Sequence, residues 1–282
     1  MPEPRTPIIT LTTDFGTADH YVGALKAAIL SVTTGVVIVD ITHDVPPHDV
    51  MEAGWILRNV FATFPPRTVH VAVVDPGVGT SRRPILAVTE SGTFIGPDNG
   101  IFSFVFEVEK PSSIVEISAT HYLRSGVSST FHGRDIFAPA AAHRAMGIPP
   151  GNFGETVEDP VLIDLPRAKV GQDGTVRATV IHVDRFGNVI LNVTREVMEA
   201  YMEKVKATGF TARSGEATIE RMASTYGEAP AGEAFLLYNS SGYLEIAANR
   251  SRASDLVKLR AGDKVELCPG GQKPPATGSL AS

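Results

Sequence analysis

The chain has 282 residues, of which 43% are hydrophobic and 20% charged, and its formal net charge is −6. A soluble globular protein of this length buries enough surface to fold without a disulfide or a structural metal. The negative charge, with no basic stripe, excludes a nucleic-acid partner. No apolar run reaches the ~20 residues of a membrane helix, and the first residues lack the basic and apolar regions of a signal peptide. We therefore expect a cytoplasmic protein without a membrane contact, whose single Cys268 forms no internal disulfide.

The first half of the chain alternates between strand and helix patterns. Apolar runs rich in β-branched residues predict three strands, over residues 7–14, 35–42 and 68–75. Amphipathic runs predict two helices between them, over residues 19–32 and 48–64. Segment 84–100 has the pattern of a hairpin, and strand 35–42 is of the kind buried on both faces of a parallel sheet. Two helical crossovers between apolar strands predict an α/β fold with a mostly parallel sheet and right-handed connections.

The pattern changes near residue 165. Apolar and polar residues then alternate, with turn signals between them, over 174–193, 233–250 and 263–268. This alternation predicts a smaller antiparallel barrel or sandwich. We expect an N-terminal α/β domain over 1–168, a C-terminal antiparallel domain over 169–270, and a disordered tail over 271–282, which is rich in Pro, Gly and Ser.

Two carboxylates follow predicted strands of the first half. Ligands bind beyond the carboxyl ends of the strands in an open α/β sheet, and Asp14 and Asp75 both fall there. A carboxylate in the position of Asp14 commonly grips a vicinal diol such as a ribose, whereas Asp19, at a helix start, is interpreted more simply as an N-cap. Asp75 begins the turn "DPGVGTSRR", whose proline and glycines suit a turn. A turn alone has no need of Asp75 or of Arg82.

Three further segments carry candidate polar side chains. "STFHGRDIFAPAAAH" (129–143) places His132 in a loop before a helix of small residues, next to a possible ion pair of Arg134 and Asp135. "VDRFGNVILN" (183–192) and "YNSSGYLEIAANR" (238–250) combine polar side chains with glycine, and each has the simpler interpretation of a hairpin turn. The chain has no G-x-G-x-x-G, Walker or H-E-x-x-H motif, which argues against a phosphate cradle but leaves a nucleoside open.

Together these segments resemble a known family. "TDFG", "DPGVGTSRR", "TFHGRD", "DRFGNVILN" and "NSSGYLEIA", in this order, resemble the S-adenosylmethionine (SAM) hydroxide adenosyltransferases, which are SAM hydrolases related to the bacterial fluorinase and chlorinase. The resemblance runs from about residue 7 to residue 268. It implies an N-terminal α/β domain, a C-terminal β-barrel-like domain, and hydrolysis of SAM to adenosine and L-methionine. It also implies a homotrimer whose active sites lie at subunit interfaces, between the N-domain of one subunit and the C-domain of the next.

The resemblance also implies roles for the substrate-binding residues. Asp14 matches the carboxylate that holds both ribose hydroxyls. Phe186 and Tyr226 match the residues that sandwich the adenine, and Asn188 matches its hydrogen-bonding partner. The residues that match those holding the methionine ammonium and carboxylate are Asp19, Asp184 and Ser240.

The resemblance also implies which nucleophile the protein uses, through a second set of residues. The hydroxide-using branch carries an Asp, an Arg and a His that fall on Asp75, Arg82 and His132. The halide-using branch has a tyrosine at the position of Asp75, and the fluorinase has a serine at that of Gly133, so water is the expected nucleophile. Because the departing thioether needs no proton, Asp75 and His132 are expected to take or relay the proton of water, with Arg82 stabilising negative charge. Which of the two holds the proton stays open, and we expect neither a metal nor a cofactor.

Three other functions are compatible with parts of the sequence. Halide-dependent adenosyl transfer is disfavoured by Asp75. A non-catalytic sensor of SAM or adenosine has no need of the Asp, Arg and His set. A metal-dependent phosphoesterase would use a di-metal cluster built from Asp14, His43, Asp44, Asp75 and His132. The nearby Arg82 and Arg83 cations disfavour the metal cluster.

Overall fold

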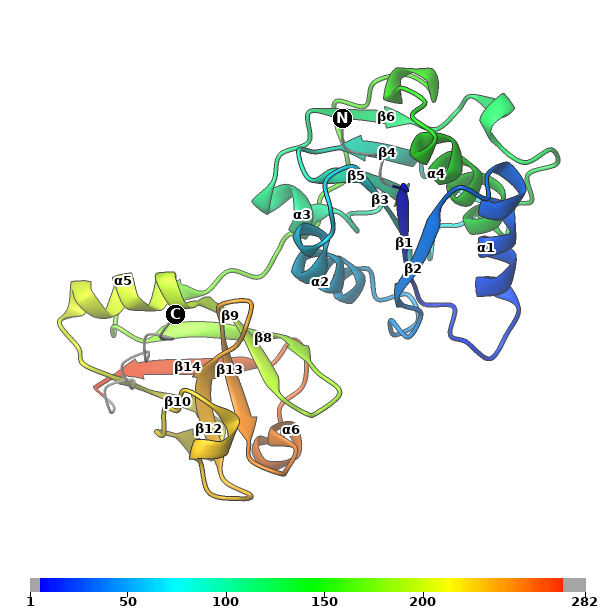
Figure 1. Ribbon diagram of the computed structural model, residues 1–282. Coiled ribbons are helices and arrows are strands. Elements are labelled where there is room, and N and C mark those ends of the chain that lie inside the picture. The colour runs from blue at the N-terminus through cyan, green and yellow to red at the C-terminus, as the bar shows by residue number, and fades with distance from the viewer. Residues whose placement is uncertain (1–5, 271–282) are drawn as a thin grey trace, which may run out of the picture. The chain divides into compact units, whose positions relative to one another are not determined.

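The computed structural model describes residues 6–270, which form two compact units with their boundary along the chain between Leu165 and Pro166 (Figure 1). The tail predicted to be disordered, 271–282, lies outside the described residues. No helix within residues 6–270 is both long and apolar enough to cross a membrane.

The first unit is built on a six-stranded sheet in the order β2-β1-β3-β5-β4-β6. Its strands are β1 (Ile8–Thr13), β2 (Val37–Thr42), β3 (Thr68–Val73), β4 (Pro84–Val88), β5 (Gly92–Pro97) and β6 (Ser113–Glu116). β1, β2, β3 and β5 are parallel, whereas β4 runs antiparallel to both β5 and β6. The predicted α/β fold with a mostly parallel sheet is confirmed, as is the hairpin, which is formed by β4 and β5.

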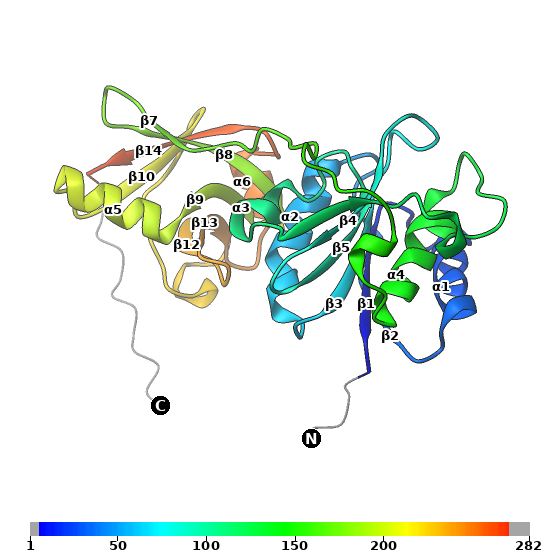
Figure 2. The same ribbon diagram turned by 90° about the horizontal axis from the view of Figure 1, so that it is seen from above.

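Helices cover both faces of this sheet. α1 (Tyr21–Val32) and α4 (Ala138–Ala145) pack together on one face, and α2 (Val50–Val60) and α3 (Ser103–Val108) on the other (Figure 2). The central strand β3 explains this layering, because its side chains alternate between the faces. Val69, Val71 and Val73 join the core under α1 and α4, while Ala72 joins the core under α2 and α3.

Two local expectations for the first unit are wrong. β2 has no fully buried residue, because it is the edge strand of the sheet rather than one of its centre strands. Asp19 does not cap α1, since the N-cap position belongs to His20, which makes no capping hydrogen bond with its side chain. The short helical turns of this unit are η1 (Phe61–Thr63), η2 (Thr120–Tyr122), the π-helix η3 (Gly133–Phe137) and η4 (Pro150–Asn152).

The second unit is an antiparallel sheet in the order β11-β10-β14-β8-β9-β13-β12, with β7 paired to β8. Its strands are β7 (Lys169–Val170), β8 (Val176–Val183), β9 (Val189–Thr194), β10 (Phe210–Ser214), β11 (Ala217–Ile219), β12 (Ala234–Tyr238), β13 (Tyr243–Ala248) and β14 (Lys264–Pro269). The sheet nearly closes into a barrel, because Leu236 N donates to Arg221 O (2.8 Å) and so joins the chain after β11 to β12. The barrel-like interpretation of this half is confirmed.

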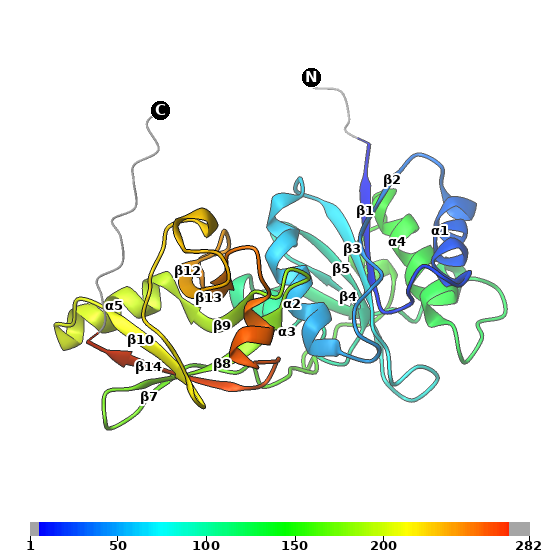
Figure 3. The ribbon, with the colours of Figure 1, turned by 90° about the horizontal axis from the view of Figure 1, so that it is seen from below.

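Three helical segments accompany this sheet. They are α5 (Arg195–Val205), η5 (Tyr226–Glu228) and α6 (Ala253–Val257). α6 lies against β12 and β13 (Figure 3). The turns β8–β9 and β12–β13 lie at opposite ends of the paired strands β9 and β13, since Ile246 faces Val189 and Tyr243 faces Thr194.

Candidate active site

The turn after β3 carries an acid and a base that bind each other. The Arg82 guanidinium folds back onto the Asp75 carboxylate, with Nε 2.9 Å from Oδ1 and 3.1 Å from Oδ2, and Nη2 also donates to Oδ2. Both side chains are nearly out of solvent, with 6% of the Asp75 side chain and 9% of the Arg82 side chain exposed. The guanidinium also lies over the ring of Phe137, its Cζ 5.2 Å from the ring centroid.

His132 completes this group from a distant part of the sequence. Arg82 Nη2 lies 2.9 Å from His132 Nδ1, so the guanidinium joins the carboxylate to the imidazole. His132 is the N-cap residue of η3 rather than part of a free loop, and the Arg134–Asp135 pair expected beside it does form, at 2.7 Å. We call Asp75, Arg82 and His132 the trio. The structure thus brings together the three residues to which the family resemblance gave roles at the nucleophile.

A close contact between two loops holds the trio together. Gly79 has a φ of +76°, and a Cβ at this position would lie 2.3 Å from the carbonyl oxygen of Ser129. Only glycine therefore lets the turn after β3 approach the segment that leads to His132. Asp135 anchors the same segment, because its carboxylate accepts from Ser128 N (2.9 Å). Burial raises the pKa of Asp135, but the bonds from Arg134 and Ser128 outweigh it and lower the pKa to about 2.

The charge state of His132 follows from these surroundings. Burial lowers its pKa below the ordinary value, and the Arg82 guanidinium lowers it further, against an opposing effect of Asp75. The imidazole is therefore neutral at pH 7. Because a guanidinium can only donate, Nδ1 accepts the bond from Arg82 and the ring proton resides on Nε2. Arg82 Nη1 is buried and has no hydrogen-bond partner within residues 6–270.

Asp14 lies at the end of β1, close to the loop of His132. Its Oδ2 accepts from the backbone N–H of His48 (2.9 Å), in the turn before α2. The neighbouring Phe15 contacts Phe131, which precedes His132, with ring centroids 5.8 Å apart. This aromatic contact ties the loop of Asp14 to that of the trio. Asp19 is exposed, in the bend between this loop and α1.

The five residues of the hypothetical di-metal cluster, Asp14, His43, Asp44, Asp75 and His132, do not form a metal site. His43 is buried and its Nδ1 lies 2.8 Å from Thr13 Oγ1, while its Nε2 lies 3.1 Å from Asp40 Oδ1. Asp75 is held by Arg82 instead. Among the described residues, no group of three or more His, Cys, Asp or Glu side chains is arranged to hold a metal ion.

The second unit has its own pocket, beside the β8–β9 turn. It measures about 620 Å³ and its lining residues are Asp184, Phe186, Asn188, Tyr226 and 248–252. Asp184 accepts from both the backbone N–H and the side-chain Nδ2 of Asn188, each at 2.9 Å. Phe186 is 77% exposed and Tyr226 48%, so both rings offer free surface. The four residues proposed from the sequence for this region thus line one pocket.

Other parts of this pocket were not identified from the sequence. The segment after β13 packs on the β8–β9 turn, with Arg252 Nη1 donating to Arg185 O (2.7 Å). Gly187 permits this packing, because a Cβ there would lie 2.6 Å from Cβ of Arg252. Behind the pocket, Glu245 on β13 accepts from the Tyr226 hydroxyl (2.9 Å). The polar residues Asn249 and Arg250, directly after β13, were the available sequence signal for the segment that packs on the turn. No sequence signal marks Glu245 behind the pocket.

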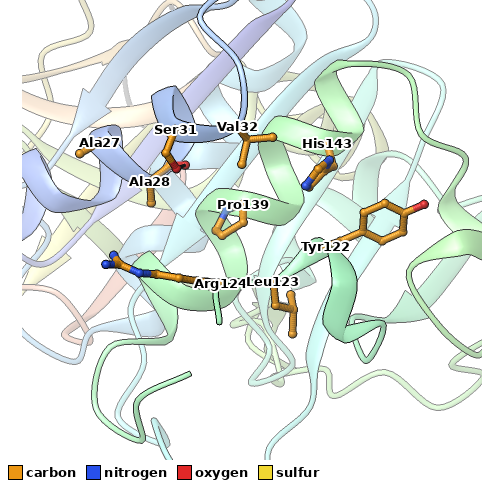
Figure 4. Close-up of a pocket in the computed structure, with 9 residues that line it drawn as sticks. All are labelled: Ala27, Ala28, Ser31, Val32, Tyr122, Leu123, Arg124, Pro139 and His143. Carbon is orange, nitrogen blue, oxygen red and sulfur yellow. Dashed lines mark hydrogen bonds between the residues drawn. The ribbon is translucent and has the colours of Figure 1, made fainter. Parts of the chain in front are cut away.

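Ser240 does not lie with these residues. It is exposed in the β12–β13 turn, at the end of β13 away from the β8–β9 turn, and it does not line the pocket. The first unit has a further cavity of about 510 Å³ between α1, α4 and residues 122–124, lined by side chains that include Ser31, Tyr122, Arg124 and His143 (Figure 4). Neither Asp14 nor the trio lines that cavity.

The chain thus combines an α/β unit that carries an Asp–Arg–His trio at the carboxyl end of β3 with a β-barrel-like unit that carries a pocket walled by aromatic rings. The chain belongs to the SAM hydroxide adenosyltransferase family, whose N-terminal domain model matches residues 9–154 and whose C-terminal domain model matches residues 178–266.

Known proteins are similar over almost the whole chain. The (R)-S-adenosyl-L-methionine hydrolase of Salinispora tropica is 35% identical, over 94% of this chain and 99% of its own. That of Methanocaldococcus jannaschii is 36% identical, over 92% and 95%. The fluorinase of Actinoplanes sp. is 26% identical. A crystal structure of an uncharacterised conserved protein from Thermotoga maritima aligns with a TM-score of 0.86 at 36% identity, covering 92% of this chain and 99% of that one.

Proposed function

We propose that this protein hydrolyses S-adenosyl-L-methionine to adenosine and L-methionine. The observation that carries the proposal is the trio itself, in which one buried guanidinium binds a carboxylate and an imidazole at the carboxyl end of β3. The identity of 35% with a SAM hydrolase over nearly the full length supports the same reaction.

In the proposed reaction, the oxygen of water attacks C5′ of the ribose. The C5′–S bond breaks, and the sulfur keeps the bonding electrons and leaves as the neutral thioether of methionine. The leaving group needs no proton, so the catalytic task is to remove one from water, and each turnover releases one proton. Because the sulfonium and the incoming hydroxide neutralise each other, exclusion of water from the site favours the transition state.

We propose different tasks for the members of the trio. His132 carries its proton on Nε2 and its Nδ1 is engaged by Arg82, so it donates a hydrogen bond to the attacking water rather than taking a proton from it. Asp75 is then the proton acceptor. The Nη1 group of Arg82, which has no partner among residues 6–270, stabilises the developing hydroxide.

The remaining residues are proposed to bind the substrate. Asp14 uses Oδ2 for the His48 N–H, and its Oδ1 is offered to the ribose hydroxyls. Asn188 gives one amide hydrogen to Asp184, which leaves its Oδ1 and second N–H for the N6 and N7 edge of adenine. Phe186 and Tyr226 supply the two aromatic walls.

The proposal has further parts. The family resemblance implies a homotrimer with active sites at subunit interfaces, and contacts of Asp19, Asp184 and Ser240 with the methionine part. The proposed enzyme also works without a cofactor and in the cytoplasm. Activity that persists in a strong chelator would support a reaction without a metal.

A product assay in heavy-oxygen water tests the function. Purified protein incubated with SAM is expected to yield adenosine and methionine in equal amounts, with the heavy oxygen in the 5′-hydroxyl. Since the relatives' names specify the (R) substrate, both sulfonium epimers should be supplied separately. Tight binding of SAM without any adenosine would instead indicate a sensor, and turnover that requires chloride or fluoride would indicate halide transfer.

A further inference from the structure

Tyr226 forms one wall of the pocket although its backbone has little regular support. It lies in η5, a three-residue turn in the connection between β11 and β12, and its side chain is 48% exposed. Its ring meets that of Phe235 edge to face, at a centroid distance of 6.5 Å and an interplanar angle of 71°. Such an edge contact alone leaves the ring free to tilt.

The hydroxyl of Tyr226 is held by a buried acid. It donates to Oε1 of Glu245 at 2.9 Å, and Glu245 is only 2% exposed. Burial raises the pKa of Glu245, and the nearby Asp184 raises it as well, while bonds from Tyr226 and Asn239 act in the opposite direction. Burial, together with the charge of Glu245, also raises the pKa of Tyr226, so the hydroxyl remains a donor at every physiological pH.

A carboxylate at this position is costly for the fold. Its cross-strand neighbour on β12 is Leu237. Leu237 belongs to a small apolar cluster whose other members are Phe235, Ala247, and Ala223 and Ala229 of the connection between β11 and β12. An apolar side chain would suit such surroundings better, because burying a carboxyl among neutral partners is unfavourable. What the carboxylate provides is a fixed acceptor directly behind the pocket.

We propose that Glu245 is a positioning residue that fixes the ring of Tyr226 and thereby sets the affinity of the pocket for a planar purine. This inference rests on the proposed function, in which Tyr226 stacks on adenine. A stacking partner that is already held in place loses less conformational freedom when the ligand binds. The arrangement parallels that of Asp184, which holds Asn188 in the same pocket. Glu245 thus orients the ring that stacks on the adenine, and Asp184 orients the amide that hydrogen-bonds to it.

A double-mutant cycle on the full-length chain tests the pair, with adenosine as the probe and its dissociation constant as the readout. Glu245→Leu is expected to weaken adenosine binding about tenfold, and Tyr226→Phe to weaken it to a similar degree. In the Tyr226→Phe background, Glu245→Leu should add less than about twofold, because the bond is already lost. Glu245→Gln keeps an acceptor oxygen and should retain affinity within about twofold.

A matched control separates this effect from general damage to the unit. Tyr238→Phe removes another tyrosine hydroxyl, from a half-buried residue on β12 whose ring packs on Arg195 outside the pocket. It should leave adenosine binding unchanged. For SAM turnover, Glu245→Leu should raise KM by a larger factor than it lowers kcat, which a merely structural defect would not do.

Several outcomes overturn the proposal. They are wild-type affinity in Tyr226→Phe, independent and additive effects in the cycle, or an equal loss in Glu245→Gln and Glu245→Leu. If Glu245→Leu does not fold, the adenosine affinities of Tyr226→Phe and Glu245→Gln still decide the proposal. Failure of the wild-type protein to bind adenosine would overturn the proposed function instead, whereas binding and hydrolysis with an additive cycle would remove only the role of Glu245.

Discussion

Replacing Asp75 by asparagine separates the catalytic role of the trio from its structural role. The substitution keeps the shape of the side chain but removes its charge and its capacity to accept a proton. It also turns an amide toward the Arg82 guanidinium, which is only 9% exposed and would lose its counterion. Breaking a buried ion pair in this way costs about 3–5 kcal/mol of folding free energy.

The kinetic effect is of similar size but has a different origin. Loss of a general base lowers kcat by about 10²–10⁴-fold, which corresponds to about 3–5 kcal/mol of activation free energy. Affinity for adenosine should change by less than about tenfold, because Asp75 is not assigned to its binding. The measurements are single-turnover kinetics, adenosine titration and urea denaturation.

A second variant distinguishes the two effects. Asp75→Asn combined with Arg82→Gln makes the pair neutral, so most of the lost stability should return while turnover stays low. Asp98→Asn provides the control, since Asp98 binds the adjacent Arg83 at 2.7 Å and is 4% exposed but lies outside the trio. It should destabilise the protein without a comparable loss of kcat. The assignment of Asp75 as proton acceptor is refuted if Asp75→Asn keeps kcat within tenfold while KM rises, or if the neutral pair regains activity.

Three further predictions concern pH and backbone geometry. Burial and Arg82 lower the pKa of His132 below 6.5, and only the neutral ring accepts the hydrogen bond from Arg82. The acid limb of the pH profile of kcat/KM should therefore have its midpoint below pH 6.5. A midpoint at or above pH 6.5 contradicts this role of His132. Burial lowers the pKa of His70 to about 4 from 6.5, so between these values the unfolded chain binds a proton that the folded one does not. Stability should therefore fall as the pH drops from 6.5 to 4, by about 3 kcal/mol at about 1.4 kcal/mol per pKa unit, and urea denaturation of His70→Gln should lack this component. Gly79→Ala should lower kcat more than tenfold, because the new Cβ would lie 2.3 Å from Ser129 O. The control is Gly126→Ala, since Gly126 has a similar φ of +74° but no atom within 4 Å of its Cβ position. Equal activities in the two variants would show that the contact between Gly79 and Ser129 is irrelevant.

Glu245 on β13 is buried by a segment of the chain that comes from outside its own strand. In "GYLEIAA", Leu244 and Ile246 point into the barrel core, so the alternation puts Glu245 on the opposite face of β13. Periodicity assigns a residue to a face but carries no information on what lies over that face. Here the segment containing Tyr226 buries Glu245, so an ordinary exposed position becomes a buried acid. The same limit explains β2, whose apolar pattern suits a central strand although it forms the edge.

The sequence by itself determined the strands β1, β2 and β3 with the helices α1 and α2 between them, the change from parallel to antiparallel architecture, and the ordered motifs that define the family. These are local properties, because periodicity, turn residues and motif spacing are set by neighbours along the chain. Only the tertiary structure decided that Arg82 turns back to Asp75 and also reaches His132, fifty positions further on, and that Ser240 lies apart from Asn188. Such contacts depend on how loops from separate strands converge at one edge of a sheet, which requires the packed fold.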